Sequence, residues 1–397
     1  MLVLVAPGQG AQTPGFLTPW LDVPGVADRL TWWSAVADLD LVHYGTEADA
    51  DTIRDTAIAQ PLLVAAGIAA ALALFPHPAE AFRQVGAVAG HSVGELTAAA
   101  GTGAITAESA MALVRERGRA MAAAAAVTRT SMTAVLGGDP DEVLAKLAEL
   151  GLTPANNNGT GQIVAAGTVE QLEALQADPP AKARLIALSV AGAFHTEHMA
   201  PAVARMGQLA KGVTAHDPRM RYISNLDGRI VHSGREIVDR IVAQIASPVR
   251  WDLCMQTMRE LGVTGILEVP PAGTLTGIGK RQFKGVETFA LKTPDQLEDA
   301  REFVARHAEP AQHPFNASPT WRMLVAPFSG TVQRAKIGEG AVLARGEHLA
   351  TVASRREDQK LFAEHGGTLL EWLVEDGDPV SPGQPLVRIH PDAEAAE

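Results

Sequence analysis

A short segment in the first quarter of the chain, Gly90-His91-Ser92-Val93-Gly94-Glu95, constrains the fold more than any other. The apolar run 85–89 precedes it, and an alanine-rich run up to Ala100 follows it. The first run predicts a buried strand and the second a helix. A serine between two glycines at a strand-to-helix turn is typical of a nucleophile elbow in an α/β protein. The sequence therefore predicts a mostly parallel sheet covered by helices, with Ser92 presented at a turn.

The position of Ser92 favours catalysis over a plain turn with a serine N-cap. At a helix N-terminus, free backbone N–H groups and the helix dipole stabilise developing negative charge. A serine hydroxyl also needs a base, and the chain has 12 histidines. His195 follows an apolar strand in a glycine-bearing turn, where a base at a sheet edge is expected, and His198 is near enough to compete.

Residues 128–190 predict a smaller inserted subdomain. Two helix starts with capping-box patterns, at Asp139 and Thr168, alternate with short apolar strands. The resulting order is strand, helix, strand, strand, helix, strand, which is ferredoxin-like. The expected strands are 132–136, 153–156, 163–166 and 185–190. The large subdomain would then comprise 1–127 and 191–305.

The last quarter of the chain has a different composition. Residues 306–321 are rich in proline and histidine and predict a linker. Residues 322–391 contain an internal repeat, in which 326–332 match 363–369 at an offset of 37 residues. Two related sets of short strands and glycine turns predict a small β-sandwich with two equivalent halves. Residues 392–397 would be a tail.

Composition narrows the functional classes. The formal net charge of −12 argues against nucleic acid as the main partner. A single cysteine, Cys254, fits a reducing cytoplasm and is expected to be a small buried hydrophobe. The longest apolar stretch, 62–75, is too short for a membrane span and predicts a buried core helix. We expect a cytoplasmic protein that binds no membrane, with a monomer as the default state.

Several segments in chain order resemble the malonyl-CoA:acyl carrier protein transacylases of fatty-acid synthesis and the related acyltransferase domains of polyketide synthases. The resemblance covers roughly residues 1–300 and is specific because its motifs are many. They are Pro7 to Gln12, Gln60-Pro61, Gly90 to Glu95, Arg117-Gly118, Ala155 to Asn158 with Gln162 to Val164, Phe194-His195, Pro248 to Trp251 and Glu268 to Gly273.

The resemblance implies roles for the reacting groups. Ser92 would be the nucleophile, and His195 the base and later the acid. The imidazole would be oriented by a backbone carbonyl, that of Arg250, at a position where relatives often carry glutamine. The backbone N–H groups of Gln9 and Val93 would form the oxyanion hole.

The resemblance also implies a substrate. By charge pattern alone, Arg117 belongs to a basic helical run with Arg115 and Arg119, and such runs are usually solvated. The resemblance instead assigns Arg117 to the carboxylate of a malonyl group, which a guanidinium holds with two parallel hydrogen bonds. Phe194 favours malonyl over methylmalonyl. Further pocket contacts are expected from Gln60 and His91.

The implied reaction is ping-pong transfer from malonyl-CoA to the phosphopantetheine thiol of acyl carrier protein, with no metal or bound cofactor. Lys280, Arg281 and Lys284 would form a basic rim for the acidic carrier, although positive charge at a helix C-terminus is as good an explanation. A hydrolase using Ser92 and His195 is the enzymatic alternative, and Arg117 and the loop around Gln9 argue against it. Whether fatty-acid or polyketide synthesis is served stays open.

The C-terminal repeat resembles biotinyl/lipoyl carrier domains. At the hairpin position of their modified lysine this chain has Arg356, and Lys360 is four residues out of register. Arginine cannot form the amide, so we expect no biotin or lipoate and a docking or stabilising role. A carrier or scaffold protein built around this domain is the non-enzymatic alternative, and Arg356 argues against a carrier.

Overall fold

The computed structural model describes the chain except for residues 160, 191, 309–321, 364–365 and 392–397. The chain divides into two compact units, Met1–Gln312 and His313–Glu397. The boundary falls inside the expected linker 306–321, most of which lies outside the described residues, as does the expected tail. Helix α13, Leu297–His307, extends over the first two residues of that linker.

The first unit is built on a six-stranded sheet in the order β11-β10-β1-β2-β7-β8. The first five strands run parallel, and β8 pairs antiparallel with β7 at one edge. The chain is therefore a mixed α/β protein with a mainly parallel sheet, as its sequence predicts. The strands are β1 Leu2–Ala6, β2 Ala87–Gly90, β7 Arg221–Ile223, β8 Ile230–Val231, β10 Gly265–Glu268 and β11 Glu287–Ala290.

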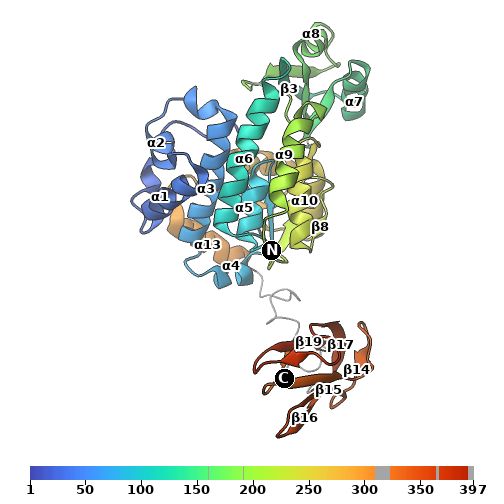
Figure 1. The fold of residues 1–397 in the computed structure, drawn as a ribbon. Helices are drawn as coiled ribbons and strands as arrows, with labels where there is room; N and C mark the ends of the chain where they lie inside the picture. The colour runs from blue at the N-terminus through green and yellow to red at the C-terminus, as the bar shows by residue number, and fades with distance from the viewer. Residues whose placement is uncertain (160, 191, 309–321, 364–365, 392–397) are drawn as a thin grey trace. The chain divides into compact units, whose positions relative to one another are not determined.

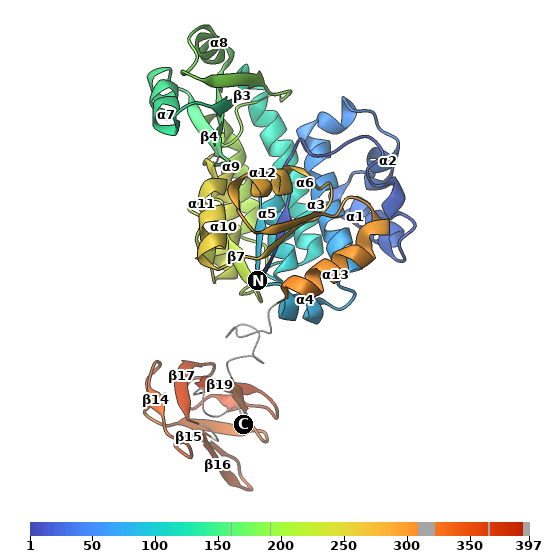
Figure 2. The same cartoon turned by 180° about the vertical axis from the view of Figure 1, so that it is seen from behind.

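Alternate residues of β1 enter two different cores, because successive side chains of a strand point to opposite faces. Leu2 and Leu4 pack in the core with α3, α5, α6 and α9, which lie in front of the sheet in Figure 1. Val3 and Val5 pack in the core with α11 and α12, which are in front in Figure 2. These helices are α3 Thr56–Leu74, α5 Gly94–Gly101, α6 Ala107–Ala125, α9 Ala200–Ala210, α11 Trp251–Glu260 and α12 Thr274–Gln282.

Helix α3 contains the apolar stretch 62–75. It begins earlier than predicted, at Thr56, because the side chain of Asp55 accepts a hydrogen bond from the N–H of Ala57, and Pro61 is accommodated inside the helix. By length and composition α3 is the one described helix that could cross a membrane, but 72% of its most apolar window is buried inside the protein. It is a core helix.

Residues 130–187 form a second sheet, which projects above the first in Figure 1. Its order is β6-β3-β5-β4-β9, with β9 (Val249–Arg250) contributed by the large subdomain. Both predicted helix starts are present, at Asp139 and Thr168, and the latter has the full capping box. The elements are β3 Thr130–Gly137, α7 Pro140–Glu149, β4 Thr153–Asn157, β5 Gln162–Thr168, α8 Val169–Ala177 and β6 Ala183–Ala187.

The second unit contains two four-stranded sheets, β12-β19-β17-β14 and β16-β15-β13-β18. The internal repeat relates them: β13, β14 and β15 each begin 37 residues before β17, β18 and β19. Each of these strands therefore corresponds, in the other half of the repeat, to a strand of the other sheet. The strands are β12 Arg322–Val325, β13 Gly330–Arg334, β14 Val342–Leu343, β15 His348–Ala353, β16 Asp358–Phe362, β17 Gly367–Trp372, β18 Pro379–Val380 and β19 Pro385–Pro391.

Candidate active site

Ser92 stands in the tight turn between β2 and α5. Its φ of 54° is in the left-handed region, which side chains seldom adopt. Gly90 and Gly94 are required because main-chain segments lie too close to them to leave room for a side chain. A Cβ on Gly90 would lie 2.0 Å from the main chain of Gly94, and a Cβ on Gly94 would lie 2.3 Å from the carbonyl oxygen of Ala6. The turn therefore has the geometry of a nucleophile elbow.

His195 is the histidine that meets Ser92. Its Nε2 lies 2.7 Å from Ser92 Oγ, and the side chain is only 3% exposed. His195 also has positive φ, 62°, so both members of the pair are held in strained backbone. His198, the alternative from the sequence, is instead the middle residue of the short 3-10 helix η3 (Glu197–Met199).

The carbonyl that orients His195 belongs to Gln244, so the prediction of Arg250 was wrong. His195 Nδ1 lies 2.8 Å from the carbonyl oxygen of Gln244. Gln244 is the last residue of α10, Gly234–Gln244, where a helix leaves carbonyls without intrahelical partners. Arg250 is occupied elsewhere: its N–H donates to the carbonyl of Asn225, and its guanidinium pairs with Asp252 at 2.8 Å.

Burial sets the charge state of the base. Desolvation, with the nearby positive charge of Arg117 as the second cause, lowers the pKa of His195 to about 3. The hydrogen bond to Gln244 opposes this shift. The imidazole is therefore neutral at pH 7, with Nδ1 donating to the carbonyl and Nε2 free to accept the proton of Ser92.

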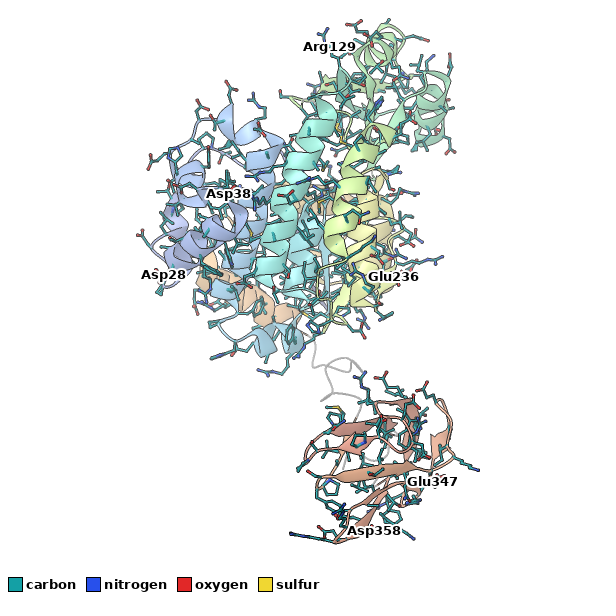
Figure 3. All side chains as sticks on the ribbon, in the orientation of Figure 1. Asp28, Asp38, Arg129, Glu236, Glu347 and Asp358 are labelled. Carbon is teal, nitrogen blue, oxygen red and sulfur yellow. The ribbon has the colours of Figure 1, made fainter. Side chains whose placement is uncertain are left out.

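Arg117 faces inward, away from the basic run in which it lies. Arg115 and Arg119 pair with Asp38 at 3.1 Å on the surface, where Figure 3 labels Asp38. Arg117 is fully buried, with Nη2 3.4 Å from Ser92 Oγ. Solvation of the whole run, the interpretation from charge pattern alone, therefore does not hold for Arg117.

The guanidinium of Arg117 is only partly satisfied. Nη1 donates to Gln60 Oε1 at 2.7 Å, and Nη2 donates to Gln244 Oε1 at 2.8 Å. Buried Nε has no hydrogen-bond partner among the described residues. Burial lowers the pKa of Arg117 to about 10, so the group is still cationic at neutral pH. A buried, charged N–H without a partner suits an anionic ligand.

Two buried residues that sequence reasoning missed hold the elbow. Asn225 Oδ1 accepts from the N–H of Ser92 at 2.8 Å, and its Nδ2 donates to the carbonyl of Gly90 at 2.7 Å. The side chain of Gln244 donates to the carbonyl of Ser92 at 3.0 Å. Asn225 follows β7 at the same sheet edge as Ser92, and this position was the only available signal. Gln244 ends an amphipathic helix and gave none.

The two N–H groups expected to form an oxyanion hole are both free of partners in the described part of the chain. Val93 is the N-cap of α5. The loop that carries Gln9 is anchored by its side chain, which donates to the carbonyl of Arg54 at 3.1 Å. Gln9 also lines the cavity that contains Ser92. The geometry is compatible with the predicted role.

A cavity of about 260 Å³ lies over Ser92 and His195, between the large and small subdomains. The other predicted contact residues all lie at it. Gln60 is buried beside Arg117, Phe194 lines the wall, and His91 Nε2 is 2.9 Å from Asn158 Oδ1 of the small subdomain. Burial lowers the pKa of His91, which is therefore neutral at pH 7. No described group of three or more His, Cys, Asp or Glu is placed to hold a metal ion.

Comparisons with known proteins assign the chain to a family. Residues 3–306 match the acyl transferase domain family. The malonyl CoA-acyl carrier protein transacylase of Mycobacterium tuberculosis is 52% identical over 299 residues, which are 75% of this chain and 99% of that protein. The Escherichia coli K12 protein of the same name is 32% identical over 312 residues, 75% of this chain and 98% of its own.

Solved structures give the same result. The crystal structure of MCAT from Mycobacterium tuberculosis superposes with a TM-score of 0.74 at 52% identity, covering 76% of this chain and 99% of that one. A malonyl-transacylase in complex with a type II PKS acyl-carrier protein superposes with a TM-score of 0.71 at 29% identity, covering 76% and 99%. The fold and the site thus define an acyltransferase. The chain belongs to the family of malonyl CoA-acyl carrier protein transacylases.

Proposed function

We propose that this protein transfers a malonyl group from malonyl-CoA to the phosphopantetheine thiol of acyl carrier protein, for fatty-acid or polyketide synthesis. The observation that carries the proposal is one buried site in which His195 Nε2 is 2.7 Å and Arg117 Nη2 is 3.4 Å from Ser92 Oγ. A nucleophile with its base makes an acyl ester possible, and the guanidinium beside it selects an acyl group that carries a carboxylate.

In the first half of the reaction, Ser92 Oγ attacks the thioester carbonyl and His195 Nε2 takes the hydroxyl proton. The N–H groups of Gln9 and Val93 stabilise the oxyanion, and losing one such donor typically costs about 3–4 kcal/mol. When the tetrahedral intermediate collapses, the carbon–sulfur bond breaks and the CoA thiolate takes the proton from His195. The products are a malonyl-Ser92 ester and free CoA.

In the second half, the carrier thiol gives its proton to His195 and its sulfur attacks the ester carbonyl. The bond between the acyl carbon and Ser92 Oγ then breaks, Oγ takes the proton back from His195, and the malonyl thioester of the carrier is released. Pairing of the malonyl carboxylate with Arg117 also matters for the base. The positive charge of Arg117 is one cause of the low pKa of His195, so neutralising that charge raises the basicity of the imidazole when the right substrate is bound.

The test is an intact-mass measurement after incubation with malonyl-CoA, with Ser92→Ala as the matched control. We expect a malonyl adduct on the wild type, none on the variant, and discharge of the adduct on addition of carrier protein. Release of malonate without an adduct would favour a hydrolase. No adduct and no turnover would rule out the substrate assignment.

Carrier docking is proposed for Lys280, Arg281 and Lys284. All three are exposed at the end of α12 or just beyond it, and the first half of α12 lines the cavity. Arg281 donates to the side chain of Gln162, another cavity residue, at 3.2 Å. If the basic rim steers an acidic carrier, replacing the three by glutamate should raise the KM for carrier and leave acylation by malonyl-CoA unchanged.

The finer architecture is also proposed. The strand order β6-β3-β5-β4 supports a ferredoxin-like small subdomain on an α/β-hydrolase-like large one. The two exchanged sheets support a β-sandwich of biotinyl/lipoyl type. Arg356 lies in the turn between β15 and β16, while Lys360 is in β16 opposite Thr351. Figure 3 labels Asp358, the first residue of β16. This placement supports an unmodified domain, which an intact mass equal to the sequence mass would test.

The remaining expectations are likewise proposals. They are a cytoplasmic location, a monomeric state, no bound cofactor, and no nucleic-acid or membrane partner.

A further inference from the structure

Glu95 is a buried carboxylate that the steps above do not use. It is the second residue of α5, three positions after Ser92, and only 1% exposed. Its Oε1 accepts from the N–H of Asn225 at 2.7 Å, and its Oε2 accepts from Nε2 of Gln244. Burial raises the pKa of Glu95 to about 7, against the effects of these hydrogen bonds and of the charge of Arg117. A carboxylate is tolerated in such a place only when its partners compensate for lost hydration.

The side-chain amide of Gln244 can face only one way while Glu95 is ionised. Its Nε2 faces the carboxylate and the carbonyl of Ser92, and its Oε1 faces Nη2 of Arg117 at 2.8 Å. A carboxylate and a carbonyl only accept hydrogen bonds, and a guanidinium only donates them. A reversed amide would therefore set oxygen against oxygen on one side and N–H against N–H on the other.

Gln244 contacts the base, the substrate-binding arginine and the nucleophilic serine. The backbone carbonyl of Gln244 accepts from His195 Nδ1 at 2.8 Å, while its side chain contacts both Arg117 and Ser92. A group that fixes Gln244 therefore acts on the substrate-binding cation and on the base together. Among the described residues, Glu95 is the anion that contacts Gln244 directly.

We propose that Glu95 is a positioning residue for malonyl transfer: acting through the amide of Gln244, it fixes the direction in which Arg117 presents its free N–H groups to the substrate carboxylate. The inference rests on the proposed function and extends it. Glu95 touches no substrate atom in this scheme. It affects only the orientation of Arg117 and of His195, both of which Gln244 contacts.

Glu95→Gln tests the inference, because it keeps the shape and removes the charge. Without the charge of Glu95, Gln244 Nε2 loses its charge-assisted hydrogen bond, so the Gln244 amide and its oxygen beside Arg117 are held less firmly. We expect kcat/KM for malonyl-CoA to fall about 10- to 100-fold, as loss of a charge-assisted hydrogen bond gives, mainly through KM. Acetyl-CoA, which has no carboxylate, should be affected much less, so the malonyl-to-acetyl ratio should fall.

The experiment is a double-mutant cycle with Gln244→Ala, measured at pH 8 as single-turnover acylation of Ser92 by each acyl-CoA. If Glu95 acts through Gln244, the Glu95→Gln change should have little further effect once Gln244 is alanine. The matched control is Glu236→Gln in the first turn of α10. Glu236 is an exposed carboxylate labelled in Figure 3, and its replacement should change neither rate.

An unchanged malonyl-to-acetyl ratio in Glu95→Gln, or fully additive losses in the cycle, would overturn the inference. If Glu95→Gln does not fold, Glu95→Asp replaces it. Aspartate keeps the charge but withdraws it by one methylene, and it must shift the ratio in the same direction or the inference fails. A wild type that forms no malonyl ester would overturn the proposed function as well, whereas an acylated wild type beside an unchanged variant ratio would overturn this inference only.

Discussion

Replacing Arg117 by methionine should change which acyl group the site accepts. Methionine fills much of the same buried volume but offers no N–H to a carboxylate. Among the described residues, Nε of Arg117 has no hydrogen-bond partner and Nη2 lies 3.4 Å from Ser92 Oγ, so these two groups can bind a carboxylate side by side. Losing that pair should reduce malonyl transfer by roughly 2–4 kcal/mol, or about 30- to 1000-fold in kcat/KM.

The informative quantity is the ratio of malonyl to acetyl acylation rates. Arg117→Met also strips the side-chain oxygens of Gln60 and Gln244 of a donor, and any resulting distortion slows both substrates alike. The ratio cancels that shared loss and isolates recognition of the carboxylate. The control is Arg119→Met on the same helix, whose partner Asp38 is at the surface (Figure 3), and it should leave the ratio unchanged. Equal losses for both substrates would refute the assignment of Arg117.

Further predictions concern the supports of the site. Arg250→Ala should change kcat less than threefold, because the guanidinium of Arg250 bonds to Asp252 rather than to Ser92 or His195; a loss above about 100-fold would contradict this. Asn225→Ala should lower the free energy of unfolding by about 2–5 kcal/mol in urea, since it deletes one buried and one partly buried hydrogen bond at the elbow. Burial raises the pKa of Glu95 from its ordinary value of 4.5 to about 7. Its contribution to the free energy of unfolding is therefore fully present below pH 4.5 and is lost as the pH rises to about 7. Between pH 4.5 and pH 7 the free energy of unfolding of the wild type should therefore fall by about 3 kcal/mol relative to that of Glu95→Gln, as measured by urea unfolding. A chain of residues 1–312 should retain malonyl transfer, because solved relatives match over 99% of their length without a counterpart of the second unit.

Sequence patterning predicted the elements that depend on local chemistry. The elbow, the two capped helix starts and the 37-residue repeat follow from residue types at fixed spacings, and all are present. The predicted start of α3 was wrong because Pro61 suggested the first turn of a helix. In the structure the helix begins at Thr56, capped by Asp55, and its burial against the sheet stabilises it despite the internal Pro61.

The supports of the site could not be predicted in the same way. A backbone carbonyl is present in every residue, so nothing in the sequence distinguishes that of Gln244 from that of Arg250. The inward direction of Arg117 depends on how α6 packs against α3, and its neighbours two residues away face solvent. Such features come from tertiary packing between segments far apart in the chain.

The left-handed backbone at Ser92 also limits which nucleophiles this fold can use. A residue branched at Cβ is strongly disfavoured at a φ of 54°, so threonine, although it carries a hydroxyl, would push the turn out of shape. Cysteine has the same unbranched Cβ as serine and fits the turn. A cysteine could therefore replace Ser92 as the nucleophile at this elbow during evolution, whereas a threonine could not.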